Sequence, residues 1–321
     1  MRRAIIDIGT NTVKLLVAEV RDGRVTPIAA KDATTRLGER VHETQQLSSA
    51  AISRTVEAIA RFVAEARALG TTDITAITTS AARDAINRDN FFEAVRRQSG
   101  LAVQMISGER EAELIFRGVC SDPAWAGEPL LVMDIGGGST EFIQGTAGRI
   151  ERHCSLQLGA VRMTEQFGET QFTELCAFLR DTLRRELADY KLSGRRLIGT
   201  GGTILTLAAV GRLYESALVP PPLHSPRKLS GQGSGLQQII DHTTLTCDEA
   251  RSLVERLRAM SVSERRNVPG LPPERADIIV AGGAVAVAAM EVLGTTGLTP
   301  LGAGLTVSVR SLRFGALVEE F

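Results

Sequence analysis

Two glycine-rich segments of nearly the same plan recur in this chain. The first reads Ile5-Ile6-Asp7-Ile8-Gly9-Thr10-Asn11-Thr12, and the second reads Leu131-Val132-Met133-Asp134-Ile135-Gly136-Gly137-Gly138-Ser139-Thr140-Glu141. An apolar run this short, closed by glycine, favours a buried strand that ends in a turn. Glycine lets the backbone approach a ligand, and consecutive N–H groups in such a turn can bind phosphate oxygens. Two such loops predict two related lobes that hold a phosphorylated ligand between them.

The segments after the two loops repeat the same order of expected elements. Strands are expected over 13–20 and 25–30 after the first loop, and over 140–144 and 150–155 after the second. Helix and strand then follow in each half, and the helix expected over 173–190 places its apolar residues on one face. The repeat is weak in sequence and lies mainly in the order of the elements.

Two further apolar runs end in paired glycines. The run 197–200 precedes Gly201-Gly202, and the run 278–281 precedes Gly282-Gly283. Each run is expected to lead into a helix of small residues. The first of them adds a third glycine turn for phosphate binding.

Composition narrows the classes of function. The chain has 321 residues, a formal net charge of zero and 43% hydrophobic residues, which is typical of a globular protein. Zero net charge argues against binding to duplex nucleic acid or to an anionic membrane surface. No apolar run reaches the roughly 18 residues of a membrane span, and no signal-peptide core follows Met1. The four scattered cysteines predict reduced thiols and a cytoplasmic location.

Two other sequence features are less specific. The four histidines have no metal-type spacing, which makes a histidine-based hydrolase site unexpected. Residues 219–235 contain Pro220-Pro221-Pro222 and several glycines, and predict a long loop. A surface insertion is the simpler interpretation of this loop, and a lid or a partner contact is the alternative.

With these loops on strand ends, the chain resembles the exopolyphosphatase/guanosine pentaphosphate phosphohydrolase (Ppx/GppA) family of the actin-like, sugar-kinase and Hsp70 superfamily. Further segments carry the resemblance over nearly the whole chain: Thr79-Ser80-Ala81-Ala82-Arg83-Asp84-Ala85-Ile86-Asn87, Ile106-Ser107-Gly108-Glu109-Arg110-Glu111-Ala112, Leu158-Gly159-Ala160-Val161-Arg162, Pro269-Gly270-Leu271 and Arg275-Ala276-Asp277. It implies an α/β fold of two ribonuclease-H-like (actin-like ATPase) lobes with an active-site cleft between them. The expected N-terminal lobe is 1–118, joined by a C-terminal helix over 304–321, and the expected C-terminal lobe is 119–303.

The resemblance assigns Glu111 as the general base that activates water. A carboxylate within hydrogen-bond reach of an in-line water suits phosphoanhydride hydrolysis, and near bound phosphates its pKa is expected to be raised. Arg83 is expected to contact phosphate oxygens and stabilise developing charge. The plainer alternatives are that Glu111 only complements a helix dipole and that Arg83 forms a structural ion pair with Asp84 or another neighbour.

The predicted ligand sites follow the glycine loops. Asp134 and Glu141 are expected to flank a Mg²⁺ ion that also binds phosphate oxygens, with Asp7 holding the ion through water. The residues expected to bind substrate phosphates lie in three turns: Gly9, Thr10 and Asn11; Gly136, Gly137, Gly138, Ser139 and Thr140; Gly201 and Gly202.

Some residues depart from the family pattern. Thr10 and Thr12 stand where serine is usual and keep the hydroxyl, and residues 301–305 lack the usual Arg-Glu between glycines. Longer members carry additional helical domains, and this chain resembles only the two-lobed core. Stepwise rather than processive degradation of long polymers is therefore expected.

The resemblance thus implies a Mg²⁺-dependent hydrolase that releases terminal orthophosphate from polyphosphate, and it leaves conversion of guanosine pentaphosphate (pppGpp) to ppGpp open as a second activity. The expected assembly is a homodimer. Two alternatives stay open at this stage. One is a kinase or ATPase of the same superfamily, and the other is a non-catalytic sensor that binds polyphosphate or (p)ppGpp.

Overall fold

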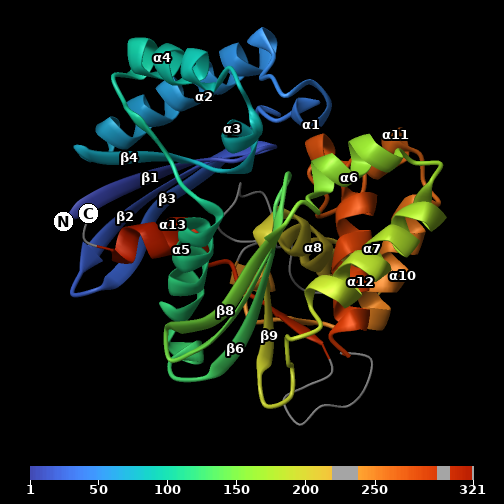
Figure 1. Ribbon diagram of the computed structural model, residues 1–321. Helices are drawn as coiled ribbons and strands as arrows, with labels where there is room; N and C mark the ends of the chain where they lie inside the picture. The colour runs from blue at the N-terminus through green and yellow to red at the C-terminus, as the bar shows by residue number, and fades with distance from the viewer. Residues whose placement is uncertain (219–237, 295–303, 320–321) are drawn as a thin grey trace, which may run out of the picture. The chain divides into compact units, whose positions relative to one another are not determined.

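The computed structural model describes residues 1–218, 238–294 and 304–319 (Figure 1). The loop predicted over 219–235 lies outside the described residues. The strands are β1 (Arg2–Ile8), β2 (Thr12–Arg21), β3 (Arg24–Thr34), β4 (Asp73–Thr78), β5 (Val103–Met105), β6 (Pro129–Ile135), β7 (Thr140–Thr146), β8 (Arg149–Leu156), β9 (Arg196–Thr200), β10 (Thr244–Leu245) and β11 (Leu305–Val307).

Helices connect these strands. They are α1 (Val41–Thr44), α2 (Ser49–Ala68), α3 (Ser80–Asp84), α4 (Arg88–Ser99), α5 (Gly108–Cys120), α6 (Ala160–Phe167), α7 (Phe172–Glu186), α8 (Gly201–Leu218), α10 (Cys247–Arg258), α11 (Val262–Arg265), α12 (Ile279–Val292) and α13 (Leu312–Val318), with short 3-10 helices at Pro123–Trp125 and Pro273–Arg275. The expected helix over 173–190 corresponds to α7.

The two sheets share one strand plan, which confirms the predicted repeat of element order. The first sheet has the order β3-β2-β1-β4-β5, with β1-β2-β3 antiparallel and β4 and β5 parallel to β1. The second has the order β10-β11-β9-β6-β7-β8, with β7-β8 an antiparallel pair and β9 and β11 parallel to β6. In both sheets a glycine loop follows the first strand of the antiparallel group.

One apolar run differs from its expected place. The run 278–281 was expected to precede a helix, but α12 already begins at Ile279. The place beside β9 is taken by β11, from much later in the chain. All residues from Ile279 to Met290 are buried, so α12 has no polar face. A helix that is apolar all round lacks the periodicity that distinguishes it from a buried strand.

The first sheet separates two layers of helices (Figure 1). Alternate residues of β1 and β2, such as Ile6, Ile8 and Leu15, join Ile59 and Phe62 of α2 in one fully buried cluster. Helix α13 covers the opposite face of the sheet. Because side chains alternate across a strand, Asp7 and Lys14 belong to the α13 face.

Helices α5 and α13 cross at close range through two glycines. A Cβ at Gly118 would collide with the Ser311 carbonyl, and one at Gly315 would collide with the Leu114 carbonyl. No residue larger than glycine fits either position without backbone movement. The backbones of the two helices therefore approach directly.

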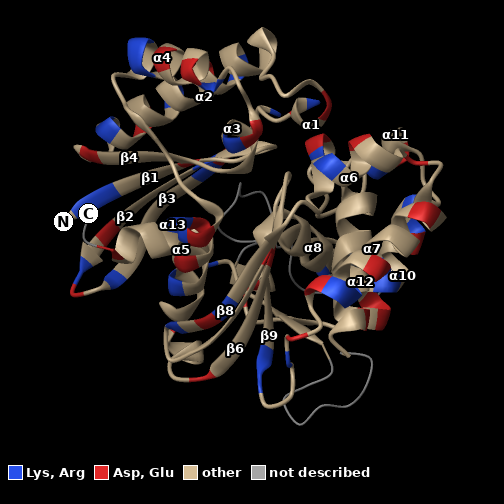
Figure 2. Cartoon of the chain, in the orientation of Figure 1, with Lys and Arg blue, Asp and Glu red and all other residues tan. Residues whose placement is uncertain are grey.

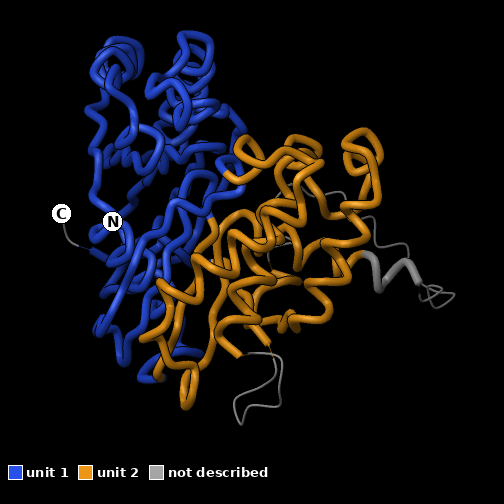
Figure 3. The backbone as a smooth tube through the Cα atoms, turned by 45° about the vertical axis from the view of Figure 1, so that its right-hand side comes forward, with its two compact units in different colours: residues 1–128, 136–162, 310–321 blue, residues 129–135, 163–309 orange. Residues whose placement is uncertain are grey.

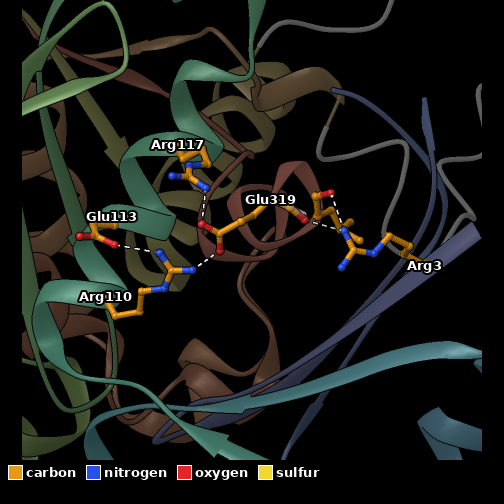
Figure 4. A network of polar contacts seen from close by, with 6 residues as sticks. Arg3, Arg110, Glu113, Arg117 and Glu319 are labelled. Carbon is orange, nitrogen blue, oxygen red and sulfur yellow. Dashed lines mark hydrogen bonds and ion pairs between the residues drawn. The ribbon is translucent and has the colours of Figure 1, made fainter. Parts of the chain in front are cut away.

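Hydrogen bonds of Glu319 join the end of α13 to α5 (Figure 4). Its carboxylate accepts hydrogen bonds from Arg110 and Arg117, and its side chain is only 17% exposed. Arg3 of β1 donates to the backbone oxygens of Leu317 and Glu319, at 3.3 and 2.6 Å. The first strand, α5 and the last described residue are thus joined by one polar network.

The chain divides into two compact units (Figure 3). Unit 1 contains 1–128, 136–162 and 310–321, and unit 2 contains 129–135 and 163–309. The predicted lobe boundaries at 118/119 and 303/304 stay predictions. The C-terminal helix, predicted over 304–321, is shorter than expected, because Leu305–Val307 forms β11 and α13 covers Leu312–Val318.

Acidic and basic residues are interspersed along the helices, as α4 and α10 show in Figure 2. This mixture matches the formal net charge of zero. Within the described part of the chain, no helix combines the length and the apolar character that crossing a bilayer requires.

Candidate active site

The backbone of the first glycine loop, Gly9 to Asn11, is hydrogen-bonded to the segment that follows β3. Its turn closes with a hydrogen bond from Gly9 N to Thr12 O, 3.1 Å long. The Thr10 carbonyl accepts from Gly38 N, and the Asn11 carbonyl accepts from the N–H groups of Thr35 and Arg36. The loop carbonyls therefore point toward this supporting segment.

The second glycine loop, Gly136 to Ser139, is built in the same way. Gly136 N donates to Ser139 O at 3.0 Å, and the loop carbonyls accept hydrogen bonds from the segment that follows β8. Ala160 N binds Gly136 O, the N–H groups of Val161 and Arg162 bind Gly137 O, and Gly159 N binds Gly138 O. Because C=O and the next N–H point in opposite directions across a trans peptide, the N–H groups of Gly137, Gly138 and Ser139 face away from that segment.

Inside unit 1 the two loops pack against each other and against the start of α3. A Cβ at Gly137 would lie 3.2 Å from Asn11 N, and one at Gly138 would lie 2.5 Å from Ser80 Oγ. Asn11 Oδ1 and Ser80 Oγ are buried and have no hydrogen-bond partner among the described residues. Buried polar atoms normally have partners, so these two atoms indicate a place for a water or a polar ligand.

Glu111 and Arg83 meet in the same unit. Arg83 Nη1 lies 2.8 Å from Glu111 Oε2 and also donates to Ile106 O at 3.0 Å. Glu111 lies in the first turn of α5 and is 7% exposed, and Ser107 caps that helix by accepting from Arg110 N. Arg83 thus forms an ion pair, as the alternative interpretation expected, but its partner is Glu111 and not Asp84. The contact of Arg83 with phosphate oxygens stays a prediction.

Glu141 points toward the same end of α5. Its Oε1 accepts a hydrogen bond from Ser155 Oγ at 2.8 Å, and Glu141 is 1% exposed. A Cβ at Gly108, the first residue of α5, would lie 3.5 Å from the Ser155 Cβ. The neighbouring Thr140 hydroxyl donates to Leu158 O at 2.8 Å, so it also holds the hairpin in place.

Asp7 lies in a charged row on the α13 face of the first sheet. In the strand register Asp7 is opposite Lys14, and Lys14 is opposite Asp32. Arg313 of α13 donates to Leu15 O at 2.9 Å. Burial raises the pKa of Asp7, while Lys14 and Arg313 lower it in part. The Asp7 carboxylate therefore has two cationic neighbours from the protein itself.

Unit 2 supplies the remaining predicted residues. Asp134 is 9% exposed and is opposite Thr200 in the parallel register of β6 and β9. A Cβ at Gly201 would lie 2.6 Å from Asp134 Oδ1, and Gly201 has a φ of +86° that suits glycine. The Thr200 hydroxyl is buried without a hydrogen-bond partner among the described residues. Gly202 packs directly against the Arg275 guanidinium.

The predicted metal ligands have suitable donor chemistry. Asp7, Glu141 and Asp134 offer carboxylate oxygens, which hard cations such as Mg²⁺ prefer, together with water and substrate oxygens. Asp7 and Glu141 belong to unit 1, and Asp134 belongs to unit 2 beside the orphaned Thr200 hydroxyl. Each of these positions can contribute an oxygen ligand.

Sequence reasoning missed several residues that surround the predicted site. Ser80 and Arg162 lie in segments that carried the family resemblance, but neither was assigned a role. Lys14 could have been found from strand alternation, because it faces Asp7 across the hairpin. Arg275 needed the fold, since it is far from Gly202 in sequence.

Two sheets of one strand plan, each with a glycine loop after its first strand, define an α/β protein of the two-lobed actin-like class. A family model described as the Ppx/GppA phosphatase family matches residues 16–314. The chain belongs to the Ppx/GppA phosphatase family.

Named relatives agree with this assignment. Exopolyphosphatase 1 of Mycobacterium leprae (strain TN) is 31% identical over 296 residues, covering 91% of this chain and 84% of that protein. Exopolyphosphatase 2 of Mycobacterium tuberculosis (strain ATCC 25618 / H37Rv) is 30% identical over 305 residues, covering 89% of this chain and 88% of that protein. The crystal structure of the Aquifex aeolicus member of the Ppx/GppA family has a TM-score of 0.74 and 28% identity, covering 99% of this chain and 96% of that one.

Proposed function

We propose that this chain is a Mg²⁺-dependent exopolyphosphatase that releases terminal orthophosphate from inorganic polyphosphate. The observation that carries the proposal is the Arg83–Glu111 pair in the same compact unit as two glycine loops. A carboxylate, a guanidinium and a set of outward-facing N–H groups are the parts that hydrolysis of a phosphoanhydride requires. The similarity to proteins named exopolyphosphatase supports polyphosphate as the substrate.

In the proposed reaction the N–H groups of Gly137, Gly138 and Ser139 bind oxygens of the terminal phosphate, with Thr10 and Asn11 on the other side. Glu111 accepts a proton from a water molecule while the water oxygen bonds to the terminal phosphorus. The phosphorus–oxygen bond to the rest of the chain breaks, and the leaving oxygen keeps the bonding electron pair. The products are orthophosphate and a polyphosphate shorter by one unit.

Arg83 is proposed to act on both Glu111 and the transferred phosphate. In the structure it fixes the orientation of Glu111 and donates to Ile106 O. During turnover its remaining N–H groups would donate to the oxygens of the transferred phosphate, where negative charge develops. Mg²⁺ held by Asp134, Glu141 and, through water, Asp7 would neutralise charge on the phosphate oxygens.

The catalytic test is a phosphate-release assay with Mg²⁺ on short polyphosphate, long polyphosphate, pppGpp and ATP, in parallel. Glu111→Gln keeps the shape of the side chain but removes the base, and loss of a general base lowers kcat by about 10²–10⁴-fold. Glu109→Gln is the matched control, because Glu109 is an exposed acid in the same helical turn. A Glu111→Gln enzyme within twofold of wild type would remove Glu111 from the mechanism.

The same assay separates the alternatives. pppGpp ends in a phosphoanhydride of the same kind, so its conversion to ppGpp is included in the proposal. Turnover of ATP without turnover of polyphosphate would favour a kinase or an ATPase. Binding of polyphosphate without release of phosphate from any substrate would identify a sensor.

The proposal includes a homodimer and a cytoplasmic location. Cys120, Cys154, Cys176 and Cys247 are free thiols, which supports a reducing compartment. Burial raises the pKa of Cys120 to about 11, so this thiol is poorly reactive at neutral pH. Light scattering coupled to gel filtration tests the dimer, since a mass near 34.4 kDa would show a monomer.

A further inference from the structure

Arg162 connects two segments that the proposed reaction uses, the second glycine loop and helix α3, but it has no role of its own in that reaction. Its Nε donates to the Gly138 carbonyl at 3.0 Å, and its Nη2 lies 2.5 Å from Asp84 Oδ2. The Arg162 side chain is 18% exposed, and the Asp84 side chain is 32% exposed. One guanidinium thus contacts the second glycine loop with one edge and the last residue of α3 with another.

The contact with Gly138 has a directional consequence. Fixing the Gly138 carbonyl also fixes the N–H of Ser139, because the two groups point in opposite directions across a planar trans peptide. The Gly136 and Gly137 carbonyls accept hydrogen bonds from the backbone N–H groups of residues 160–162. Gly138 O accepts from Gly159 N and also from the Arg162 side chain. Side-chain identity therefore matters most for the direction of the Ser139 N–H.

The contact with Asp84 links Arg162 to the Arg83–Glu111 pair. Asp84 and Arg83 are adjacent at the end of α3, and Arg83 holds Glu111 at 2.8 Å. The first residue of the same helix, Ser80, abuts Gly138. Helix α3 therefore contacts the glycine loop through Ser80 and carries Arg83, which pairs with Glu111. Arg162 adds a second link between the loop and this helix.

We infer that Arg162 is a positioning residue for the proposed reaction. Through its contacts with Gly138 and Asp84, it fixes the position of the second glycine loop relative to the Arg83–Glu111 pair. This inference rests on the proposed function. Arg162 itself does not touch the reacting atoms. Its two contacts decide where the terminal phosphate is bound relative to the base that activates water.

Arginine is suited to this task because its planar guanidinium presents several N–H groups in fixed directions. Lysine carries the same charge but a single nitrogen at the end of a flexible chain, so it cannot reproduce the two contacts together. Arg162→Lys is thus a change of geometry at constant charge. Asp84→Asn is the complementary change, because it keeps the shape of the side chain and removes its charge.

The structure offers a closely matched control in unit 2. Arg265 also donates from Nε to a carbonyl, Leu257 O at 2.7 Å, and from Nη1 to a carboxylate, that of Glu169. Arg265 is 2% exposed, so its replacement by lysine should disturb stability at least as much as Arg162→Lys. No part of the proposed catalytic machinery includes Arg265.

The experiment measures kcat and KM on short polyphosphate and the melting temperature for wild type, Arg162→Lys, Asp84→Asn, the double variant and Arg265→Lys. We expect kcat to fall about 10- to 100-fold in Arg162→Lys, since a misplacement on the order of 1 Å costs roughly 10²-fold. KM should change less than kcat, and Arg265→Lys should keep kcat near wild type. The double variant should be no slower than the slower single variant, because Asp84→Asn weakens the Arg162–Asp84 contact that Arg162→Lys already breaks.

Two results would overturn the inference. If Arg162→Lys and Asp84→Asn both keep kcat within twofold of wild type, the Arg162 pair is structural only, and the proposed function survives. If wild type releases no phosphate from any of the four substrates, the proposed function fails and the inference fails with it. Asp84→Asn keeps the first test decisive should Arg162→Lys fold poorly.

Discussion

In both halves of the chain a glycine loop follows the first strand of a sheet, and the segment after the third strand binds the loop carbonyls. Thr35, Arg36 and Gly38 do this for the first loop, and residues 159–162 do it for the second. Each loop also closes with a hydrogen bond from its first glycine to the residue three positions later. The backbone plan of the two loops is therefore the same.

The side chains around the two loops are different. The first loop is supported by backbone N–H groups, and its strand-end acid, Asp7, has Lys14 and Arg313 as electrostatic neighbours. The second loop has the Arg162 guanidinium behind it, and its strand-end acid, Asp134, lies beside Gly201. The two loops therefore share one backbone geometry, while the charged side chains around them differ.

The largest expected effect comes from the glycine in the second supporting segment. A Cβ at Gly159 would collide with the backbone of Gly137 and Gly138, whereas one at Gly38 would meet chiefly the Thr10 side chain. Overpacking costs about 1–3 kcal/mol, and backbone yields less than a side chain does. We expect Gly159→Ala to lower kcat/KM about 100-fold, by displacing the loop, and Gly38→Ala to lower it less.

Steady-state kinetics and melting temperatures check this prediction. Gly211→Ala is the control, because the contact that a Cβ there makes with the described residues is an ordinary one, with Leu253 Cδ1 at 3.4 Å, and alanine favours a helix over glycine. Equal activity of Gly159→Ala and Gly211→Ala would show that the supporting segment does not position the loop.

The two strand-end acids should differ in their effect on metal dependence. A neutral amide is a poorer ligand for a hard cation, so Asp134→Asn should raise the Mg²⁺ concentration for half-activity. Asp7→Asn should raise it less, because Asp7 is expected to hold the ion only through water and already has Lys14 and Arg313 as cationic neighbours. Glu141→Gln is expected to have an intermediate effect.

Titrations of activity against Mg²⁺ in the three variants provide the measurement. An unchanged half-activity concentration in Asp134→Asn and Glu141→Gln would mean that the ion is held elsewhere or by substrate alone. A larger effect of Asp7→Asn than of Asp134→Asn would reverse the contrast between the two loops.

The smallest expected effect concerns the buried Ser80 hydroxyl, which lies against Gly138 of the second loop. Ser80 Oγ is buried without a partner among the described residues, so Ser80→Ala should leave the melting temperature unchanged or slightly higher. If this hydroxyl binds substrate or a bound water, its removal should raise KM about 2- to 10-fold, because one hydrogen bond is lost. Thr55→Ala is the contrast, because its hydroxyl donates to Ala51 O and its loss should lower stability without changing KM.

Much of this architecture was predictable because its signals are local. Short apolar runs closed by glycine indicated both loops. The dipeptide Asp22-Gly23, between the strands expected over 13–20 and 25–30, is typical of a hairpin turn, and in the structure its φ angles are +48° and +72°. The pairing of Arg83 was not predictable from its neighbour Asp84, since adjacent residues of a helix point in different directions. The role of Arg162 depends on the approach of residues 159–162 to the loop, which only the tertiary structure provides.

The contact between Glu319 and α5 has a consequence for the order in which unit 1 folds. Glu319 lies 209 residues after Arg110 in the chain, yet α13 covers the sheet formed by the first strands and packs against α5. Until α13 docks, Gly118 has no partner helix, and Arg110 and Arg117 lack the Glu319 carboxylate. Contacts between distant parts of a chain form slowly, so α13 should join unit 1 late in folding. Helix α5, which carries the proposed base Glu111, would then take its final place in one of the last folding steps.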